Sequence, residues 1–290
     1  MSRRKQTIII RIIFIIGLSL VLYPIIGNVV NKIYNYWEIA KYSDLVEQVG
    51  TETDSEELST YEKMFQEARE FNSMITGEPQ VYEEDDPIYQ TYLETLDISG
   101  GMMGYLNIDK IGVRLGIYHG TEDSTLQKAV GHLEGTHLPT GDIGNSTVIT
   151  GHTGLPSADL LTDLDQLEIG DTFELAILDQ IFTYEVFEIN VVEPYEVDAV
   201  APREGIDMVT LVTCTPYGIN SHRLLVHGKQ IETQEGTGEK IQKENDTFGM
   251  IYILTILATI IVVVLIIIIL VGNYRWEKKQ KQRMQKIGKE

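Results

Sequence analysis

The only cysteine in the 290 residues, Cys214, ends an apolar run rich in β-branched residues, within TLVTCTPYGINSHR from Thr210 to Arg223. A thiol becomes a strong nucleophile when a neighbouring base or cation raises its thiolate fraction. With such a neighbour, Cys214 could attack a carbonyl carbon and form a thioester. Taken alone, the segment leaves two alternatives open, which are a buried inert thiol and an intermolecular disulfide.

Histidine is the usual base for a thiol. His152 follows a β-branched run in TVITGHTGLP, where the flanking glycines relieve backbone crowding. A histidine at such a strand end could project into a cleft as a general acid or base, although an ordinary loop histidine explains the segment equally well. His222 precedes Arg223, and consecutive residues of a strand face opposite sides, so only one of these two can share a cleft with Cys214. The other four candidates are His119, His132, His137 and His227.

Arg223 offers the third group that acyl transfer needs. Attack on a carbonyl turns its oxygen into an oxyanion, and a guanidinium supplies charge-assisted hydrogen-bond donors to it. Cys214 ends one expected strand and Arg223 begins the next, across the turn TPYGINSH. Both side chains are therefore expected at one end of adjacent strands. A surface cation is the alternative for Arg223 taken alone.

The elements that would position these residues are short strands. From about Gly104 the sequence contains β-rich runs separated by turn residues, among them GYLNI, VRLGIYHG, STVITGH, MVTLVTC and HRLLVHGKQIE. Six to eight strands in about 130 residues predict a closed barrel or a sandwich. We assign this catalytic domain to residues 101–232.

Helices are expected before this domain. In residues 28–79, apolar side chains recur at helical spacing, which predicts a helical hairpin beside the membrane. The apolar stripe on the second predicted helix consists of Leu58, Tyr61, Met64, Ala68, Phe71 and Ile75.

After the catalytic domain, the polar, glycine-containing residues 233–248 read as a linker.

Apolar segments at both ends indicate a membrane protein. Residues 1–27 read as a signal peptide or an anchor, and the lack of a clear small-x-small cleavage site favours an uncleaved anchor. The second run, within 249–272, has 22 uncharged residues from Met250 to Val271, enough to cross a bilayer. Because the N-terminal flank and the tail 273–290 are basic, we expect both termini in the cytoplasm and the middle outside the cell.

The formal net charge of −20 is strongly acidic, although both ends of the chain are basic. An acidic exterior argues against nucleic-acid binding, which needs basic patches. A solvated surface is the expected role of these charges, and an acidic patch that selects a basic partner is the alternative. A single exported cysteine also cannot form an internal disulfide.

Together these segments resemble the sortase signature: TLVTC, the histidine of TGHTG, and an arginine nine residues after the cysteine. The resemblance extends from about Gly104 to Ile231. IYHGT, GHLEGTHLP, TGHTGLPSADLLTDLDQL and TLVTCTPYGINSHRLLVHG in this order resemble class C, the pilin-polymerising sortases. The C-terminal span and the basic tail are also typical of that class.

The resemblance implies a mainly β protein, a sortase-type eight-stranded β-barrel with N-terminal helices and two transmembrane helices. It implies Cys214 as nucleophile, His152 as acid/base and Arg223 as stabiliser of the substrate or oxyanion, without cofactor or metal. The partners would be pilin subunits that carry an LPXTG-like sorting signal and an acceptor lysine. The alternatives are a sortase that anchors surface proteins to the cell wall, a thiol hydrolase with water as acceptor, and a non-catalytic membrane-anchored scaffold.

The resemblance also implies a lid in residues 80–100. Class C enzymes carry an Asp-Pro-aromatic loop over the cleft, and EEDDPIYQTY offers Asp86 and Pro87. Ile88 stands where an aromatic residue is usual, and Tyr89 follows. This predicts that Asp86 pairs with Arg223 while Ile88 and Tyr89 cover Cys214. An acidic turn with proline is the alternative.

Overall fold

The computed structural model describes residues 3–51, 59–83 and 85–233, together with scattered positions between 254 and 275. The chain divides into two units, Met1–Ile241 and Gln242–Glu290. The predicted linker 233–248, the second predicted span 249–272 and the tail 273–290 lie largely outside the described residues.

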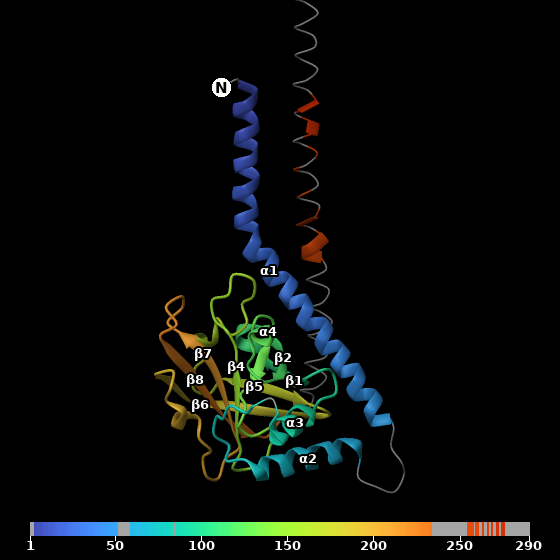
Figure 1. The fold of residues 1–290 in the computed structure, drawn as a ribbon, viewed down its shortest axis with the longest axis vertical. Helices are drawn as coiled ribbons and strands as arrows, with labels where there is room; N and C mark the ends of the chain where they lie inside the picture. Colours follow the sequence, from blue (N-terminus) through green and yellow to red (C-terminus); the bar gives the residue numbers. More distant parts are fainter. Residues whose placement is uncertain are drawn as a thin grey trace, which may run out of the picture. The chain divides into compact units, whose positions relative to one another are not determined.

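Eight strands form a closed barrel, in the order β1-β2-β3-β4-β7-β8-β6-β5 (Figure 1). This confirms the predicted eight-stranded barrel. Most neighbours are antiparallel, whereas β2–β3 and β4–β7 are parallel pairs. The strands are β1 (Met102–Ile108), β2 (Val113–His119), β3 (Val130–His132), β4 (Ser146–Thr150), β5 (Thr172–Ile177), β6 (Gln180–Val192), β7 (Met208–Thr215) and β8 (His222–Ile231).

Alternation along the strands separates the barrel interior from its outer face. On β7, Val209 and Leu211 point into the main core, whereas Val212 packs against a smaller cluster of Val148, Val200 and Leu225. Cys214 follows Val212 by two residues and therefore lies on the side of the smaller cluster. The site is thus expected on the outside of the barrel wall.

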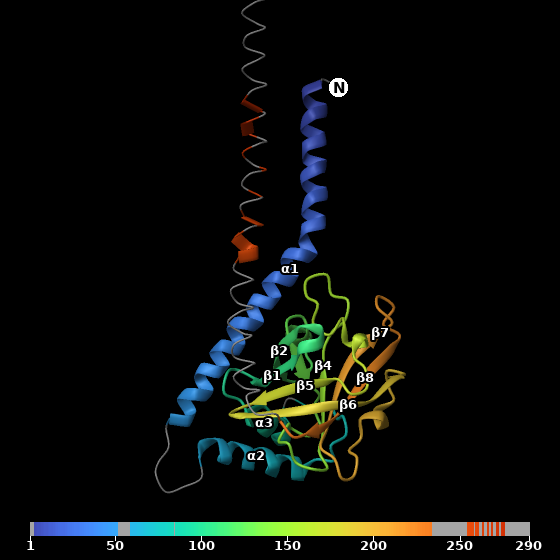
Figure 2. The same ribbon diagram turned by 180° about the vertical axis from the view of Figure 1, so that it is seen from behind.

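The first helix, α1 (Arg3–Thr51), runs without interruption through residue 27. The predicted domain boundary at that residue stays a prediction. Among the described residues α1 is the one helix long and apolar enough to cross a membrane, from Ile9 to Gly50. Pro24 lies inside it, and both ribbon views show a bend in this region (Figures 1 and 2). Proline removes one backbone hydrogen bond of a helix, which explains the bend.

The C-terminal half of α1 packs along the outer face of the barrel. Asn35 donates to the carbonyl of Lys128 at 2.7 Å and accepts from the amide of Gly116 at 3.2 Å. Further along, the Tyr42 hydroxyl donates to the carbonyl of Met103 at 2.9 Å. These bonds satisfy buried polar groups and hold the helix in one register on the barrel.

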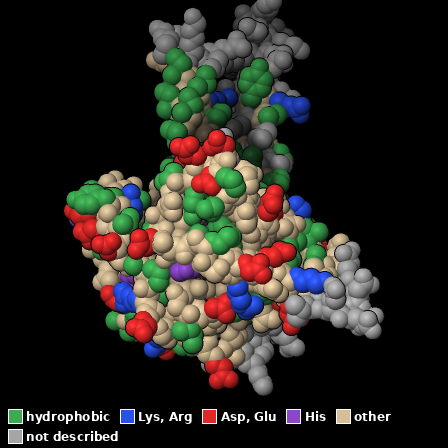
Figure 3. Space-filling view, turned by 60° about the horizontal axis from the view of Figure 1, so that its bottom comes forward, with side chains coloured by type: hydrophobic (Ala, Val, Ile, Leu, Met, Phe, Trp, Pro, Cys, Tyr) green, Lys and Arg blue, Asp and Glu red, His purple; other side chains and the backbone are tan. Residues whose placement is uncertain are grey.

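The remaining helices are short. They are α2 (Thr60–Met74), α3 (Pro87–Glu94) and α4 (Asp123–Leu126), with 3-10 turns η1 (Asp109–Ile111), η2 (Leu164–Gln166) and η3 (Val197–Val200). Ser59 caps α2 through a capping box with Glu62. Figure 3 looks onto the end of the molecule that carries α2 and shows acidic side chains spread among other types. This distribution fits a solvated acidic surface.

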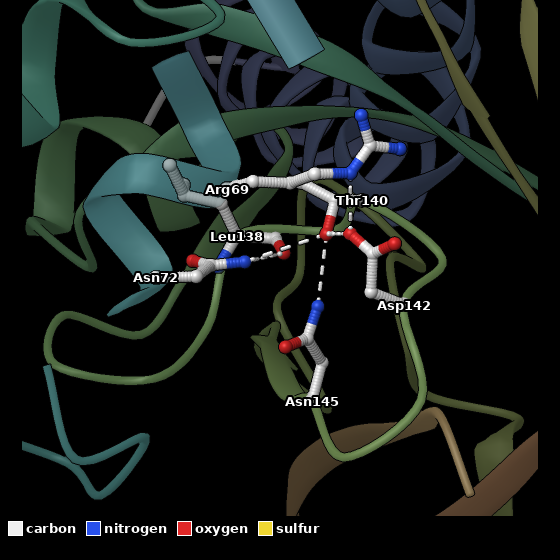
Figure 4. A network of polar contacts seen from close by, with 6 residues as sticks. All are labelled: Arg69, Asn72, Leu138, Thr140, Asp142 and Asn145. Carbon is white, nitrogen blue, oxygen red and sulfur yellow. Dashed lines mark hydrogen bonds and ion pairs between the residues drawn. The ribbon is translucent and has the colours of Figure 1, made fainter. Parts of the chain in front are cut away.

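A polar network fastens α2 to the loop that precedes β4 (Figure 4). Asn72 donates to the carbonyl of Leu138 at 3.0 Å and accepts from its amide at 2.8 Å. Arg69 pairs with Asp142 at 2.8 Å, and Thr140 donates to the same carboxylate at 2.7 Å. The loop is thereby fixed at the base of β4, at the end remote from the site.

A buried carboxyl at the start of β7 makes stability depend on pH. Asp207 is buried and accepts a hydrogen bond from the Tyr184 hydroxyl at 2.8 Å. Burial raises the pKa of its carboxyl from 3.8 to about 7. Between these values the folded state holds a proton that the unfolded chain has released, so the free energy of unfolding falls as pH rises through this window.

Asp207→Asn should therefore stabilise the protein near neutral pH, by about 1 to 3 kcal/mol. Asparagine keeps an acceptor for Tyr184 and removes the charge. Thermal unfolding of the full chain in detergent, measured across the acidic to neutral range, would show a flatter pH dependence for the variant. Identical pH profiles for variant and wild type would contradict the assignment.

Candidate active site

The β-sheet register places Cys214 opposite Arg223. The two residues are Cα partners in the antiparallel β7–β8 pair, so their side chains leave the same face of the sheet. Both side chains are partly exposed, so a substrate carbonyl can reach the thiol and the guanidinium together. His222 pairs instead with Thr215 and approaches Glu193 at 3.4 Å. Arg223 rather than His222 therefore shares the face of Cys214.

Hydrogen bonds between β4 and β7 bring His152 alongside the thiol. Thr150 and Val212 are register partners in the parallel pair, and His152 and Cys214 each follow by two residues. The amide of Gly151 donates to the carbonyl of Val212 at 3.0 Å, and the Thr213 hydroxyl donates to the carbonyl of Gly151 at 2.8 Å. These bonds continue the strand pairing up to the residue before His152. The backbone of His152 therefore lies next to the end of β7 that carries Cys214, and the His152 side chain is 32% exposed.

The guanidinium of Arg223 is oriented by backbone carbonyls. Its Nη1 donates to the carbonyl of His222 at 3.1 Å and to that of Asn220 at 3.4 Å. Asn220 has a positive φ of 59°, which turns the β7–β8 connection back towards the arginine. A guanidinium has five N–H donors, and within the described residues those on Nε and Nη2 form no hydrogen bond or ion pair. They can serve a carbonyl oxygen of a substrate.

Burial distinguishes four of the other histidines from His152. Burial lowers the pKa of His132 to about 3 and that of His227 to about 4, so both are neutral at physiological pH. His132 interacts with the Tyr92 hydroxyl at 3.0 Å, and His227 with the Thr210 hydroxyl at 2.9 Å. Burial also lowers the pKa of His119 and of His137. These four rings are structural, which leaves His152 as the candidate beside the thiol.

Asp123 is a neighbour that sequence reasoning missed. Its Oδ1 lies 3.8 Å from Nε2 of His152, and its Oδ2 accepts from Gln127 at 3.0 Å. The carboxylate would pair with the imidazolium form of His152. Because the Asp123 side chain is 81% exposed, water weakens this pair. Asp123 is 29 positions before His152, and no local pattern links the two.

The structure does not bring the predicted lid residues to Cys214. Asp86 is the N-cap of α3, accepting from the amide of Ile88 at 2.8 Å, and Pro87 occupies the first turn. An Asp-Pro pair is a strong helix start signal, which is the physical reason for this conformation. Tyr89 stacks on Tyr92 at 6.1 Å between ring centroids.

Both ribbon views place α3 near α2, at the end of the barrel away from the β7–β8 turn (Figures 1 and 2). Among the described contacts, no ion pair joins Asp86 to Arg223. A gating role of residues 86–89 therefore stays a prediction that this arrangement does not favour.

Given this position, Asp86→Ala should leave the alkylation rate of Cys214 unchanged. The loss of the cap should instead cost about 1 kcal/mol of stability. Alkylation kinetics and thermal unfolding of the same preparations separate the two effects, with Ile88→Trp as a second variant. A several-fold faster alkylation in Asp86→Ala would support the lid.

Comparisons with known proteins agree with this geometry. The family model described as "Sortase domain" matches residues 106–231. The solved structure of sortase C1 from Streptococcus agalactiae is 38% identical, with a TM-score of 0.61, covering 68% of this chain and 98% of that chain. Sortase C from Streptococcus pneumoniae is 39% identical, with a TM-score of 0.58, covering 67% of this chain and 96% of that chain.

A curated relative is more distant. Sortase D of Bacillus subtilis (strain 168) is 28% identical over 136 residues, which are 46% of this chain and 66% of that protein. The match thus spans just under two thirds of that relative.

An eight-stranded closed barrel with a thiol, an imidazole and a guanidinium at one end of its strands is the architecture of a sortase-type cysteine transpeptidase. The chain belongs to the sortase family, and its structural neighbours include class C sortases, as its motifs predicted. Sortases act on sorting signals of the LPXTG type. The apolar N-terminal helix is consistent with a membrane anchor.

Proposed function

We propose that this protein is a membrane-anchored transpeptidase that joins pilin subunits through isopeptide bonds. The observation that supports the proposal is the register of β7, which pairs Cys214 with Arg223 on β8 and pairs Val212 with Thr150 on β4, two residues before His152. Its support from relatives is the similarity to sortase C of Streptococcus pneumoniae, a structure described in connection with pilin substrate specificity.

In the first step, the thiolate of Cys214 attacks the threonine carbonyl carbon of an LPXTG-like signal. The carbonyl oxygen becomes an oxyanion, which accepts hydrogen bonds from the Arg223 guanidinium. The C–N bond to glycine then breaks as His152 donates its proton to the leaving amine. The acyl group remains on Cys214 as a thioester.

In the second step, a lysine amine of another pilin subunit attacks the thioester carbonyl. His152, now neutral, takes the proton that the amine loses. The C–S bond breaks, which regenerates the Cys214 thiolate and leaves an isopeptide bond. Repetition of both steps extends a covalent polymer.

The proposed topology puts the catalytic domain outside the cell and both termini in the cytoplasm. Its support is the apolar α1 together with the basic residues at both ends of the sequence. In this arrangement the enzyme works where exported substrates emerge.

The test is to incubate the full chain in lipid nanodiscs with candidate pilins and to identify cross-linked peptides by mass spectrometry. An isopeptide between a sorting-signal threonine and a pilin lysine is expected. Cleaved signal without any amine-linked product, at every amine concentration, would instead identify a thiol hydrolase. Linkage only to a cell-wall peptide amine would identify a surface-protein anchoring sortase.

A further inference from the structure

The loop that carries His152 contacts the anchor helix at the end of its apolar stretch. This loop joins β4 to β5, and both ribbon views show it reaching the bend of α1 (Figures 1 and 2). Gly27 of α1 lies directly against Ser157, where a Cβ on the glycine would come within 2.9 Å of the serine Cα. Only glycine allows the helix and the loop to approach so closely.

Next to this contact, Asn28 and Asp159 form a two-point clamp. The Asn28 amide donates to the Asp159 carboxylate, and the backbone amide of Asp159 donates back to Oδ1 of Asn28 at 3.2 Å. Lys32, one helical turn further on, lies 3.4 Å from the same carboxylate. The clamp thus restrains both the side chain and the backbone of Asp159.

The clamp at Asp159 is connected to His152 through Leu161, which follows Asp159 by two residues. The amide of Leu161 donates to the carbonyl of His152 at 3.2 Å, and the Leu161 side chain packs against Gly151. Leu161 is fully buried, so its side chain holds this part of the loop against the barrel. Two residues of chain and one backbone hydrogen bond thus connect Asp159 to His152, and a displacement of Asp159 can reach the His152 backbone along this route.

We propose that Asn28 and Asp159 are positioning residues for the transpeptidation, through which the membrane anchor sets the placement of His152. The inference rests on the proposed role of His152 as acid/base. Misplacement of a proton donor by about 1 Å can cost up to 100-fold in rate, whereas binding of the sorting signal need not change. The anchor helix then positions a residue of the active site in addition to holding the protein in the membrane.

The experiment uses the full chain in lipid nanodiscs and a peptide with an LPXTG-type signal. Asn28→Ala and Asp159→Ala should each lower the acylation rate of Cys214 about tenfold at unchanged KM, and the double variant should lose no more than either single one. The exchanged pair Asn28→Asp with Asp159→Asn should restore most of the rate, because one carboxylate and one amide again face each other. The single-turnover rate constant, read apart from the amplitude, separates misplacement of His152 from a loss of folded enzyme, because partial unfolding lowers only the amplitude.

Tyr42→Phe is the matched control. It weakens the docking of α1 at the far end of the barrel, so it should lower the unfolding temperature without lowering the acylation rate. Wild-type acylation in Asn28→Ala and Asp159→Ala, with His152→Ala inactive, would overturn the clamp and leave the proposed function standing. Full acylation in His152→Ala would overturn both.

Discussion

Cys214→Ala is expected to abolish thioester trapping and polymer formation, by at least about four orders of magnitude in rate. The thiol is the only one in the chain, so no other side chain can form the thioester. Folding should survive, because the change removes one sulfur from a partly exposed position at a strand end. Mass spectrometry of enzyme incubated with a sorting-signal peptide detects the acyl adduct directly.

Cys214→Ser is the informative companion variant. It keeps the size of the side chain but replaces the thiol with a hydroxyl, which is much harder to ionise. Neither variant should show an adduct, and both should unfold near the wild-type temperature. Polymer at wild-type levels in either one would refute the mechanism.

Arg223→Lys is expected to lower the acylation rate about 100-fold, although it preserves the positive charge. The arginine is oriented by the carbonyls of His222 and Asn220, and its remaining donors keep a fixed direction relative to Cys214. A lysine ammonium is a flexible point charge that cannot reproduce this planar fork. Single-turnover acylation by a peptide measures the loss.

Arg69→Lys provides the matched control for that variant. Arg69 pairs with Asp142 at the α2 end, remote from the site, so the same chemical change should leave acylation unaffected. His152→Ala should be at least as damaging as Arg223→Lys, because it removes the proton donor to the leaving amine. Near-normal turnover in Arg223→Lys would mean that a diffuse positive field suffices.

Much of the barrel was predictable from the sequence, because strands and turns produce patterns within short stretches of neighbouring residues. Alternating β-branched runs and turn residues identify strands, and the short TPYGINSH turn predicts adjacent strands on either side of it. Cys214 and Arg223 therefore had to lie near one another, as the register shows. The type of each group was also predictable, since a thiol, an imidazole and a guanidinium each have a distinct chemical use.

Tertiary structure decided what depends on contacts between distant segments. It distinguished His152 from buried rings such as His132, because burial depends on packing of the whole barrel. It also placed Asp123 beside His152. In the same way it placed Asn28 against Asp159, a residue 131 positions further along the chain. No sequence pattern encodes such pairs, because their proximity follows from closure of the barrel and docking of α1. Asp86 combines both levels: its motif predicted a lid, which stays a prediction, while its local role as the N-cap of α3 follows from the Asp-Pro pair itself.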